Sequence, residues 1–253
     1  MYHGMWKKLM ISMLCICLCC TGMATCLAEG TESADETTIK ASESSDARDA
    51  KNEDQALSPA DEAKALLDQG EYEAGISILE EAAAKGDPEA QFVLGNCYYE
   101  GTGVEQNYEE AVKYFRLAAD QGLSWAQQNL GLCYFLGAGV EQDCEEAMRL
   151  YRLAADQGDE VATFNIGYSY YFGMGVEQDY EEAFKHFLQA AEKGVPVAMF
   201  AVGDCYNLGN GVKKDPDAAA EWMRKSLAAG YEPDESDQAH LKEVLGEKPE
   251  VQQ

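Results

Sequence analysis

The sequence from residue 123 to residue 158, LSWAQQNLGLCYFLGAGVEQDCEEAMRLYRLAADQG, sets the pattern of most of this chain. The same spacing of glycine, tyrosine and alanine returns in residues 87–122, 159–194 and 195–230, without insertion or deletion. A fixed period of 36 residues is typical of a solenoid of stacked repeats. Two glycine series that keep the period are Gly95, Gly131, Gly167 and Gly203, and Gly103, Gly139, Gly175 and Gly211.

Each unit predicts two helices joined by a tight turn. In residues 87–122, Asp87 caps the first helix and Gly101 ends it. Asn107 then caps the second helix, Glu110 completes a capping box, and Gly122 closes the helix. The corresponding caps of the second helix in the later units are Asp143, Asp179 and Asp215.

A glycine lies inside the first helix of every unit. At such a position glycine costs about 1 kcal/mol relative to alanine. Its recurrence at Gly95, Gly131, Gly167 and Gly203 indicates that a close helix approach offsets this cost. We expect the small alanines of the second helix, such as Ala118 and Ala119, to form the opposing surface.

The array has distinct ends. Residues 60–86 predict a partial repeat, because Leu79 and Gly86 lie 36 residues before Phe115 and Gly122. Residues 231–253 predict a C-terminal cap and tail, with a short polar helix near residues 236–245. The fold class is therefore predicted as an all-α solenoid of about four to five helix-turn-helix repeats.

Residues 1–28 have the pattern of a secretory signal peptide. Lys7 and Lys8 precede an uncharged apolar run, and the small residues Cys26 and Ala28 suit signal peptidase. Two alternatives remain: a lipoprotein signal with Cys26 as the lipidated residue, and an uncleaved membrane anchor. All three predict export to the periplasm, the cell surface or the medium. Residues 29–59 are acidic and poor in large apolar side chains, which predicts a disordered linker.

The formal net charge of the chain is -27 at pH 7. Such a charge repels phosphate and argues against a nucleic-acid partner. It also disfavours binding to an anionic membrane surface, so membrane contact is expected only through an N-terminal anchor. The partner class that remains is a protein or peptide.

The repeat resembles the Sel1-like repeat. Its pattern appears here as Ala126, Leu130, Gly131, Tyr134, Gly137, Gly139, Val140, Asp143, Ala147, Tyr151, Ala154, Ala155 and Gly158. The resemblance implies a right-handed superhelix related to tetratricopeptide repeats. It also implies a role as an adaptor in assembly, signalling or host contact.

The cysteines depart from the pattern of secreted cysteine-rich members, in which a disulfide staples each unit. Cys97, Cys133 and Cys205 occupy one helix position in three units, and equivalent helices lie about 8–10 Å apart, too far for a disulfide. They are therefore expected as small core residues. Cys133 with Cys144 is the one plausible bridge, as an alternative to free thiols.

No catalytic set is apparent in the sequence. His186 and His240 are far apart and have no cysteine or carboxylate at metal-ligand spacing. We therefore predict a non-enzymatic binding protein without cofactor or metal. The alternatives are a hydrolase-like activity on cell-wall material and a lipid-anchored surface spacer.

By analogy with tetratricopeptide geometry, the first helix of each unit is expected to line a concave groove. Large aromatic side chains there would make good anchors for a peptide. The alternative is that these aromatic rows are core packing between repeats, with Trp125 and Asn96 the residues most expected to be exposed. The candidate groove residues are Phe92, Asn96, Tyr99, Trp125, Gln128, Phe135, Phe164, Tyr168, Tyr171, Phe200 and Asp204.

Overall fold

The computed structural model of the chain describes residues 57–246. In that range every regular element is an α-helix. The predicted signal peptide, with Cys26, and the predicted linker as far as residue 56 lie outside the described residues. The helices are α2 (Pro59–Asp68), α3 (Tyr72–Ala84), α4 (Pro88–Glu100), α5 (Tyr108–Asp120), α6 (Ser124–Leu136), α7 (Cys144–Ala155), α8 (Glu160–Phe172), α9 (Tyr180–Glu192), α10 (Pro196–Leu208), α11 (Pro216–Ala228) and α12 (Glu235–Leu245).

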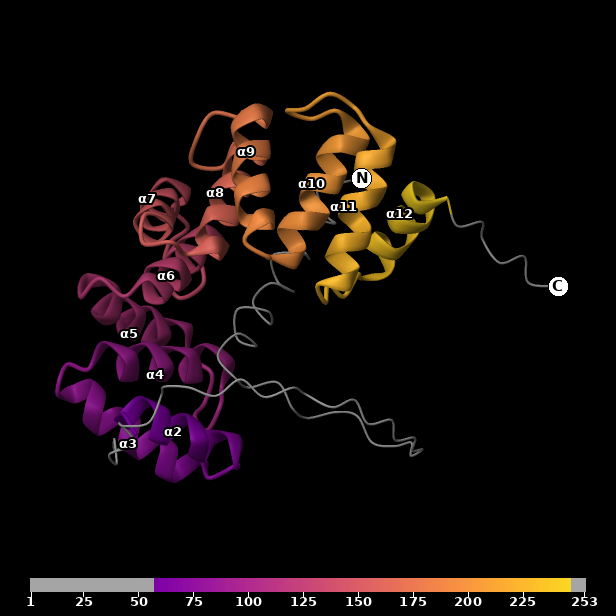
Figure 1. Ribbon diagram of the computed structural model, residues 1–253. Helices are drawn as coiled ribbons and strands as arrows, with labels where there is room; N and C mark the ends of the chain where they lie inside the picture. The colour runs from indigo at the N-terminus through magenta and orange to yellow at the C-terminus, as the bar shows by residue number, and fades with distance from the viewer. Residues whose placement is uncertain (1–56, 247–253) are drawn as a thin grey trace, which may run out of the picture.

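The helices pair and stack in chain order, which is the predicted α-solenoid. Each first helix contacts the second helix of its own unit most extensively, and each second helix then contacts the first helix of the next unit. Figure 1 shows the stack as an arc that runs from α2 and α3 to α10, α11 and α12. In this view α8 lies on the inner side of the arc and α7 on its outer side.

The predicted N-caps form as expected, but the capping box does not. Asn107 accepts hydrogen bonds from the backbone N–H groups of Glu109 and Glu110. The box also requires Glu110 to accept from the N–H of Asn107, yet that N–H donates to the carbonyl of Tyr98 at 2.8 Å. The Glu110 carboxylate instead pairs with Lys113 at 2.9 Å. The turn thus ties the two helices of a unit together through the backbone, and the same bond recurs in the later units.

The glycine inside each first helix faces an aromatic or methionine side chain of the second helix, and in three units it also lies against the backbone of one of the predicted alanines, at Ala147, Ala183 and Ala219. A Cβ on Gly95 would lie 2.7 Å from the ring of Phe115, and one on Gly131 would lie 2.8 Å from the ring of Tyr151. Phe115 and Tyr151 are fully buried. The glycine therefore leaves room for a large core side chain of the second helix.

The turn glycines connect one unit to the unit before it. Gly139 has φ +69°, and a Cβ there would overlap the carbonyl oxygen of Tyr108 at the start of α5. Gly175 and Gly211 approach the backbone of the preceding unit in the same way, at Cys144 and Tyr180. Only glycine allows both this φ and this backbone approach, so the turn is also an inter-repeat contact.

Buried amides bridge neighbouring units. The Nε2 group of Gln91 donates to the carbonyl of Ala83 at the end of α3, and Gln121 donates to Oε1 of Gln91 at 2.7 Å. Gln127 and Gln157 repeat the arrangement one unit later. These amides give partners to carbonyl groups at a helix C-terminus, which have none within the helix.

Both ends of the described stack differ from the central units. At the N-terminal end α2 and α3 form the partial repeat, with α2 ending at Asp68 and α3 starting at Tyr72. At the C-terminal end Tyr231 packs on Phe200 of α10, with ring centroids 4.9 Å apart. His240 of α12 contacts Asp204, which is also on α10. The C-terminal segment thus covers part of α10.

Candidate functional site

We assign the inner face of the arc to one row of positions on each first helix, because α8, a first helix, lies on the inner side of the arc in Figure 1. On α6 these are Trp125, Asn129, Leu132 and Leu136, which follow the helical spacing of one face. Trp125 and Leu136 are exposed, Asn129 is half-buried and Leu132 is buried. We call the row and its equivalents the inner row. Its members on α4 are Glu89, Val93, Asn96 and Glu100, and on α8 they are Val161, Asn165, Tyr168 and Phe172.

Most of the predicted groove residues lie in the core, where the alternative interpretation placed them. Phe92, Gln128, Phe164 and Phe200 are all at most 5% exposed, and Phe135 and Tyr171 are also buried. Tyr99 is half-buried, against Phe115 and Tyr108. Each of these residues comes one position before an inner-row residue. It is therefore rotated by about 100° around the helix and faces the neighbouring helices of the stack.

The remaining predicted residues belong to the inner row. Trp125 is 53% exposed and Asn96 is half-buried. Tyr168 is on the row but only 4% exposed. Asp204 is also on the row but only 2% exposed, since α12 covers it. The predicted groove is therefore corrected to a narrower surface on α4, α6 and α8.

Trp125 is held by the unit before it. Its ring centroid lies 6.1 Å from that of Phe92, in a tilted arrangement. Phe92 in turn packs on Phe115, which anchors the pair in the core. More than half of the Trp125 side chain nevertheless faces solvent, so the ring is supported on one side and free on the other.

A row of amide side chains continues from Trp125. Asn129 lies one helical turn further along α6, and its Nδ2 group donates to Oδ1 of Asn96 on α4 at 3.0 Å. Asn165 is the equivalent of Asn129 on α8 and is 2% exposed. Sequence reasoning missed Asn129 and Asn165, although the 36-residue period and the i, i+4 spacing from Trp125 indicate both.

Two oxygen atoms of the inner row have no hydrogen-bond partner. They are Oδ1 of Asn165 and Oε1 of Glu100, and both are buried. The other carboxylate oxygen of Glu100 accepts from Thr102 at 3.2 Å. Burial raises the pKa of the Glu100 carboxyl above its usual value. A buried acceptor without a donor costs about 1–3 kcal/mol, so each of these atoms lowers the stability of the stack.

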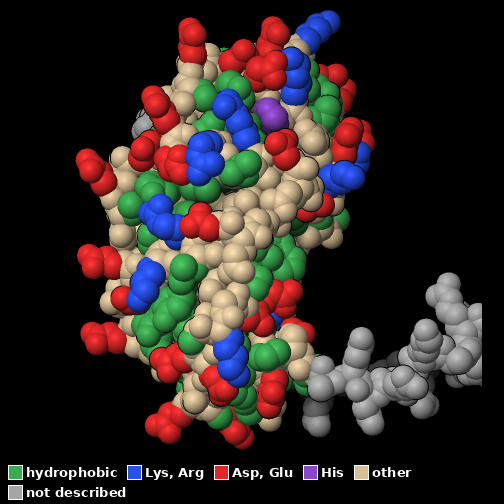
Figure 2. Space-filling view, turned by 90° about the vertical axis from the view of Figure 1, so that its left-hand side faces the viewer, with side chains coloured by type: hydrophobic (Ala, Val, Ile, Leu, Met, Phe, Trp, Pro, Cys, Tyr) green, Lys and Arg blue, Asp and Glu red, His purple; other side chains and the backbone are tan. Residues whose placement is uncertain are grey.

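The charge of the repeat is divided between its two helices. The first helices, residues 88–100, 124–136, 160–172 and 196–208, contain no Lys, Arg or His, and hold Glu89, Glu100, Glu160 and Asp204. The second helices carry both signs, as in the pairs of Lys113 with Glu110 and Arg149 with Glu146. Figure 2, which views the molecule from the left-hand side of Figure 1, shows Lys and Arg side chains interspersed with Asp and Glu.

The four cysteines of the described range are free. Cys97, Cys133 and Cys205 are buried, as expected for core residues, and burial raises the pKa of the Cys97 and Cys133 thiols to about 12. The alternative bridge between Cys133 and Cys144 is not formed. Cys133 of α6 is fully buried in the hydrophobic core, whereas Cys144 is the half-buried first residue of α7.

The two histidines of the described range have different surroundings. His186 is half-buried on α9, with its ring stacked on Tyr170, and burial lowers its pKa. His240 forms a buried pair with Asp204, a contact that nothing in the sequence indicated. Within residues 57–246, no group of three His, Cys, Asp or Glu side chains is placed to hold a metal ion. The described helices include none with the length and apolar character needed to cross a membrane.

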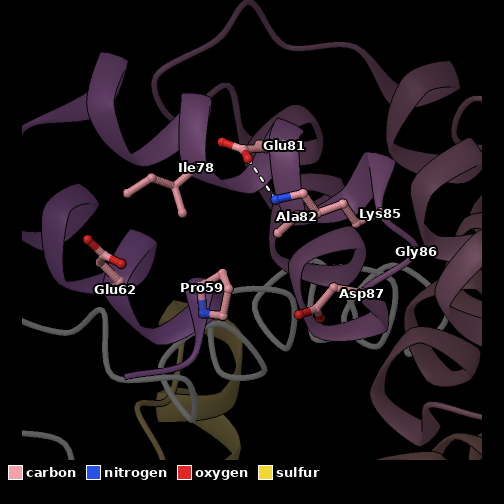
Figure 3. Close-up of a pocket in the computed structure, with 8 residues that line it drawn as sticks. All are labelled: Pro59, Glu62, Ile78, Glu81, Ala82, Lys85, Gly86 and Asp87. Carbon is pink, nitrogen blue, oxygen red and sulfur yellow. Dashed lines mark hydrogen bonds and ion pairs between the residues drawn. The ribbon is translucent and has the colours of Figure 1, made fainter. Parts of the chain in front are cut away.

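A pocket of about 520 Å³ opens at the N-terminal end of the stack, between α2, α3 and the start of α4 (Figure 3). Its one cationic lining residue, Lys85, is already paired with Glu81 at 2.6 Å. None of the predicted groove residues lines this pocket, so the inner row remains the candidate site. The lining includes Pro59, Glu62, Ile78, Glu81, Lys85 and Asp87.

The four-fold recurrence of the glycine turn, the caps and the buried aromatic residue is matched by a family model. The model of the Sel1 repeat fits residues 88–123, 126–159, 161–195 and 196–231. The chain belongs to the Sel1 repeat family. The matched residues make up more than half of the chain, and they span α4 to α11.

Solved structures agree with this Sel1 assignment. A Sel1 repeat protein from Oxalobacter formigenes is 36% identical, with a TM-score of 0.66, over 74% of this chain and 76% of that one. A protective antigen of uropathogenic Escherichia coli with an SLR fold is 32% identical, with a TM-score of 0.64. That match covers 74% of this chain and 40% of the antigen, so this chain spans less than half of it. A comparison with curated proteins finds no match.

Proposed function

We propose that this Sel1 repeat protein is an exported, non-enzymatic scaffold that holds a protein or peptide against the inner row of α4, α6 and α8. Sel1 repeat proteins generally act as protein-interaction scaffolds, and this chain has their repeat and fold. The observation that carries the proposal is Trp125. It is the exposed aromatic side chain of the inner row, beside the half-buried Asn96 and Asn129.

The energetics of interfaces support this role for Trp125. Tryptophan is enriched among the residues that carry most of the binding energy of protein interfaces. Its ring is already supported by Phe92, so little side-chain entropy is lost when a partner covers its free side. An exposed ring of this size would gain about 1.5–3 kcal/mol from full burial.

Affinity capture tests the scaffold. The full chain serves as bait beside two variants. Trp125→Ala changes the inner row, and Leu153→Ala is the control on α7, where Leu153 is 40% exposed. A partner retained by the full chain and by Leu153→Ala but lost by Trp125→Ala is the expected result. Equal capture by all three baits would place the binding site elsewhere. Capture of nothing by the full chain would refute the scaffold.

Export rests on the sequence of residues 1–28 and has its own test. We expect the chain in the exported fraction of its cells, with a mature N-terminus near residue 29. Mass spectrometry of that N-terminus distinguishes a cleaved signal peptide from an uncleaved anchor. Labelled palmitate that is incorporated in the full chain and lost in Cys26→Ser would instead indicate the lipoprotein.

A further inference from the structure

The buried face of α12 is built mainly from ionisable side chains. Among the residues of α12 whose side chains the structure describes, Asp237, His240 and Leu241 are buried, at 1%, 8% and 5% exposed. Nε2 of His240 lies 2.6 Å from Oδ1 of Asp204 on α10, and the imidazole ring packs edge-on against Phe200 of the same helix. The attachment of α12 to α10 therefore depends on groups whose charge changes with pH.

A second buried carboxyl group lies beside this pair. Oδ2 of Asp237 accepts a hydrogen bond from the hydroxyl group of Tyr231, whereas Oδ1 of Asp237 is buried without a partner. Burial raises the pKa of Asp237, and the charges of Asp234 and Asp204 raise it further. Burial also raises the pKa of Asp204. Both carboxyl groups thus hold a proton more tightly with α12 in place than they would in solvent.

His240 is the one cation that this cluster can form. Asp204 faces it from α10, and Glu243 and Asp237 act on it from α12 itself. The hydrogen bond to Asp204 raises the pKa of His240. Among the described groups that shift the pKa of these buried residues, none is a Lys or Arg. A deprotonated His240 therefore leaves the carboxylates of the cluster without a positive charge to offset them.

All three groups bind protons more tightly when α12 is docked, so docking is favoured at low pH and weakened as pH rises. The contribution of His240 is fully present below the pKa of a solvated imidazole, about 6.5, and is lost as pH rises through the higher docked value. A buried carboxylate without a partner of opposite charge costs several kcal/mol, which gives the loss its size.

The place of α12 in the stack allows it to separate alone. It is the last described helix and lies at the end of the arc in Figure 1. Its contact with α11 is the smallest between consecutive helices of the described range. Because each unit of a solenoid contacts only its neighbours, a terminal helix can leave while the other units stay folded.

We infer that α12 is a pH-dependent cover of α10, docked while His240 carries a proton and released from the folded stack when His240 loses it. Release exposes Asp204, which belongs to the inner row, and Phe200 beside it. The inner row then continues from α8 onto α10. This consequence for a bound partner rests on the proposed scaffold, whereas the release itself does not.

Hydrogen–deuterium exchange of the full chain, measured by mass spectrometry without a partner, tests the release. Protection factors, which correct for the intrinsic pH dependence of exchange, are compared for α12 and α8 at pH 5.5 and pH 8.5. An equilibrium that releases one proton shifts about tenfold per pH unit between the two pKa values. We therefore expect the protection of α12 to fall by about tenfold or more at pH 8.5, and that of α8 to change by less than about twofold.

Two variants identify the groups in control. His240→Gln does not titrate, yet its amide can still donate to Asp204, so the protection of α12 should change by less than about threefold over the same range. Asp237→Asn keeps an acceptor for the Tyr231 hydroxyl group but removes a buried carboxylate. We expect it to leave α12 better protected than in the parent at pH 8.5.

His186→Gln on α9 and Asp120→Asn at an exposed position of α5 are the matched controls, and both should leave the profile of α12 unchanged. Equal protection of α12 at the two pH values would overturn the inference. A parallel loss in α8 would overturn it too, because the whole stack would then be unfolding, and so would an unaltered α12 profile in both His240→Gln and Asp237→Asn. Capture with the Trp125→Ala bait judges the scaffold separately, since the exchange experiment contains no partner.

Discussion

Nε2 of His240 lies 2.6 Å from Oδ1 of Asp204, and the two residues are separated by one repeat length, 36 residues. Asp204 occupies the inner-row position of the fourth unit, equivalent to Asn96 and Tyr168. Both side chains are buried. Helix α12 thus covers the inner row at α10, and the buried pair of His240 and Asp204 joins these two helices.

This pair predicts stability that falls as pH rises. The hydrogen bond to Asp204 raises the pKa of His240, and burial raises the pKa of Asp204. The folded state therefore binds protons more tightly than the unfolded state at both groups. Stability from His240 is fully present below its unfolded pKa of about 6.5 and is lost as pH rises through the higher folded value. Glu243 and Asp237 of α12 also favour the charged imidazole.

His186 provides the matched control, because its shift has the opposite sign. Burial lowers its pKa, so its contribution is present above pH 6.5 and is lost as pH falls through the folded value. We expect His240→Gln to flatten the decline of the thermal midpoint between pH 5.5 and 8.5, and His186→Gln to steepen it. Identical pH profiles of the parent and His240→Gln would contradict the account of the pair.

Gly139→Ala is expected to destabilise the stack far more than Gly158→Ala. Both glycines have positive φ, but a Cβ on Gly139 overlaps the carbonyl of Tyr108, whereas nothing lies within 4 Å of a Cβ on Gly158. Left-handed backbone alone costs about 1–2 kcal/mol, and displacing the neighbouring unit adds a cost of similar or greater size, so we expect about 3 kcal/mol at Gly139. Urea unfolding of the two variants measures the difference, and equal losses would refute an inter-repeat role for the turn.

Trp125 and Phe164 should differ sharply in their effect on stability. Phe164 is 1% exposed and packs on Phe187, so Phe164→Ala should cost about 3–5 kcal/mol. Trp125→Ala should cost no more than about 1 kcal/mol, because the ring is more than half exposed. Urea denaturation monitored by circular dichroism compares the two, and a loss at Trp125 as large as that at Phe164 would mean that the ring is structural.

Thiol modification should distinguish the cysteines. Under native conditions at pH 8, iodoacetamide is expected to alkylate Cys144 well before Cys97 and Cys133. Cys144 is half-buried, whereas the other two are buried with a pKa of about 12 and hold almost no thiolate. Peptide mapping by mass spectrometry gives the order, with urea-unfolded protein as the control in which all three react. A Cys133–Cys144 disulfide in the isolated protein would contradict the free thiols of the structure.

Local sequence was sufficient for the helices and their order. The caps at Asp87 and Asn107 and the turn glycine at Gly101 act within a few residues, so their outcome was predictable. The stacking of units followed from the fixed period, because helices of this length bury their apolar faces only against neighbours. The capping box did not form, because the N–H of Asn107 that it requires donates instead to the carbonyl of Tyr98 on the preceding helix.

The candidate site was only partly determined by the sequence. A shift of one residue rotates a side chain by about 100° around a helix, which decides whether it packs between repeats or faces the groove. The sequence pattern of Phe164 and Trp125 therefore could not tell their environments apart before the helices were placed. The sequence alone determined the repeat, its period, its acidity and the pattern of an export signal. Tertiary structure alone decided which side of each first helix faces inward, which acceptors lack donors, and which residue closes the inner face, since each depends on atoms that the fold brings together from different units.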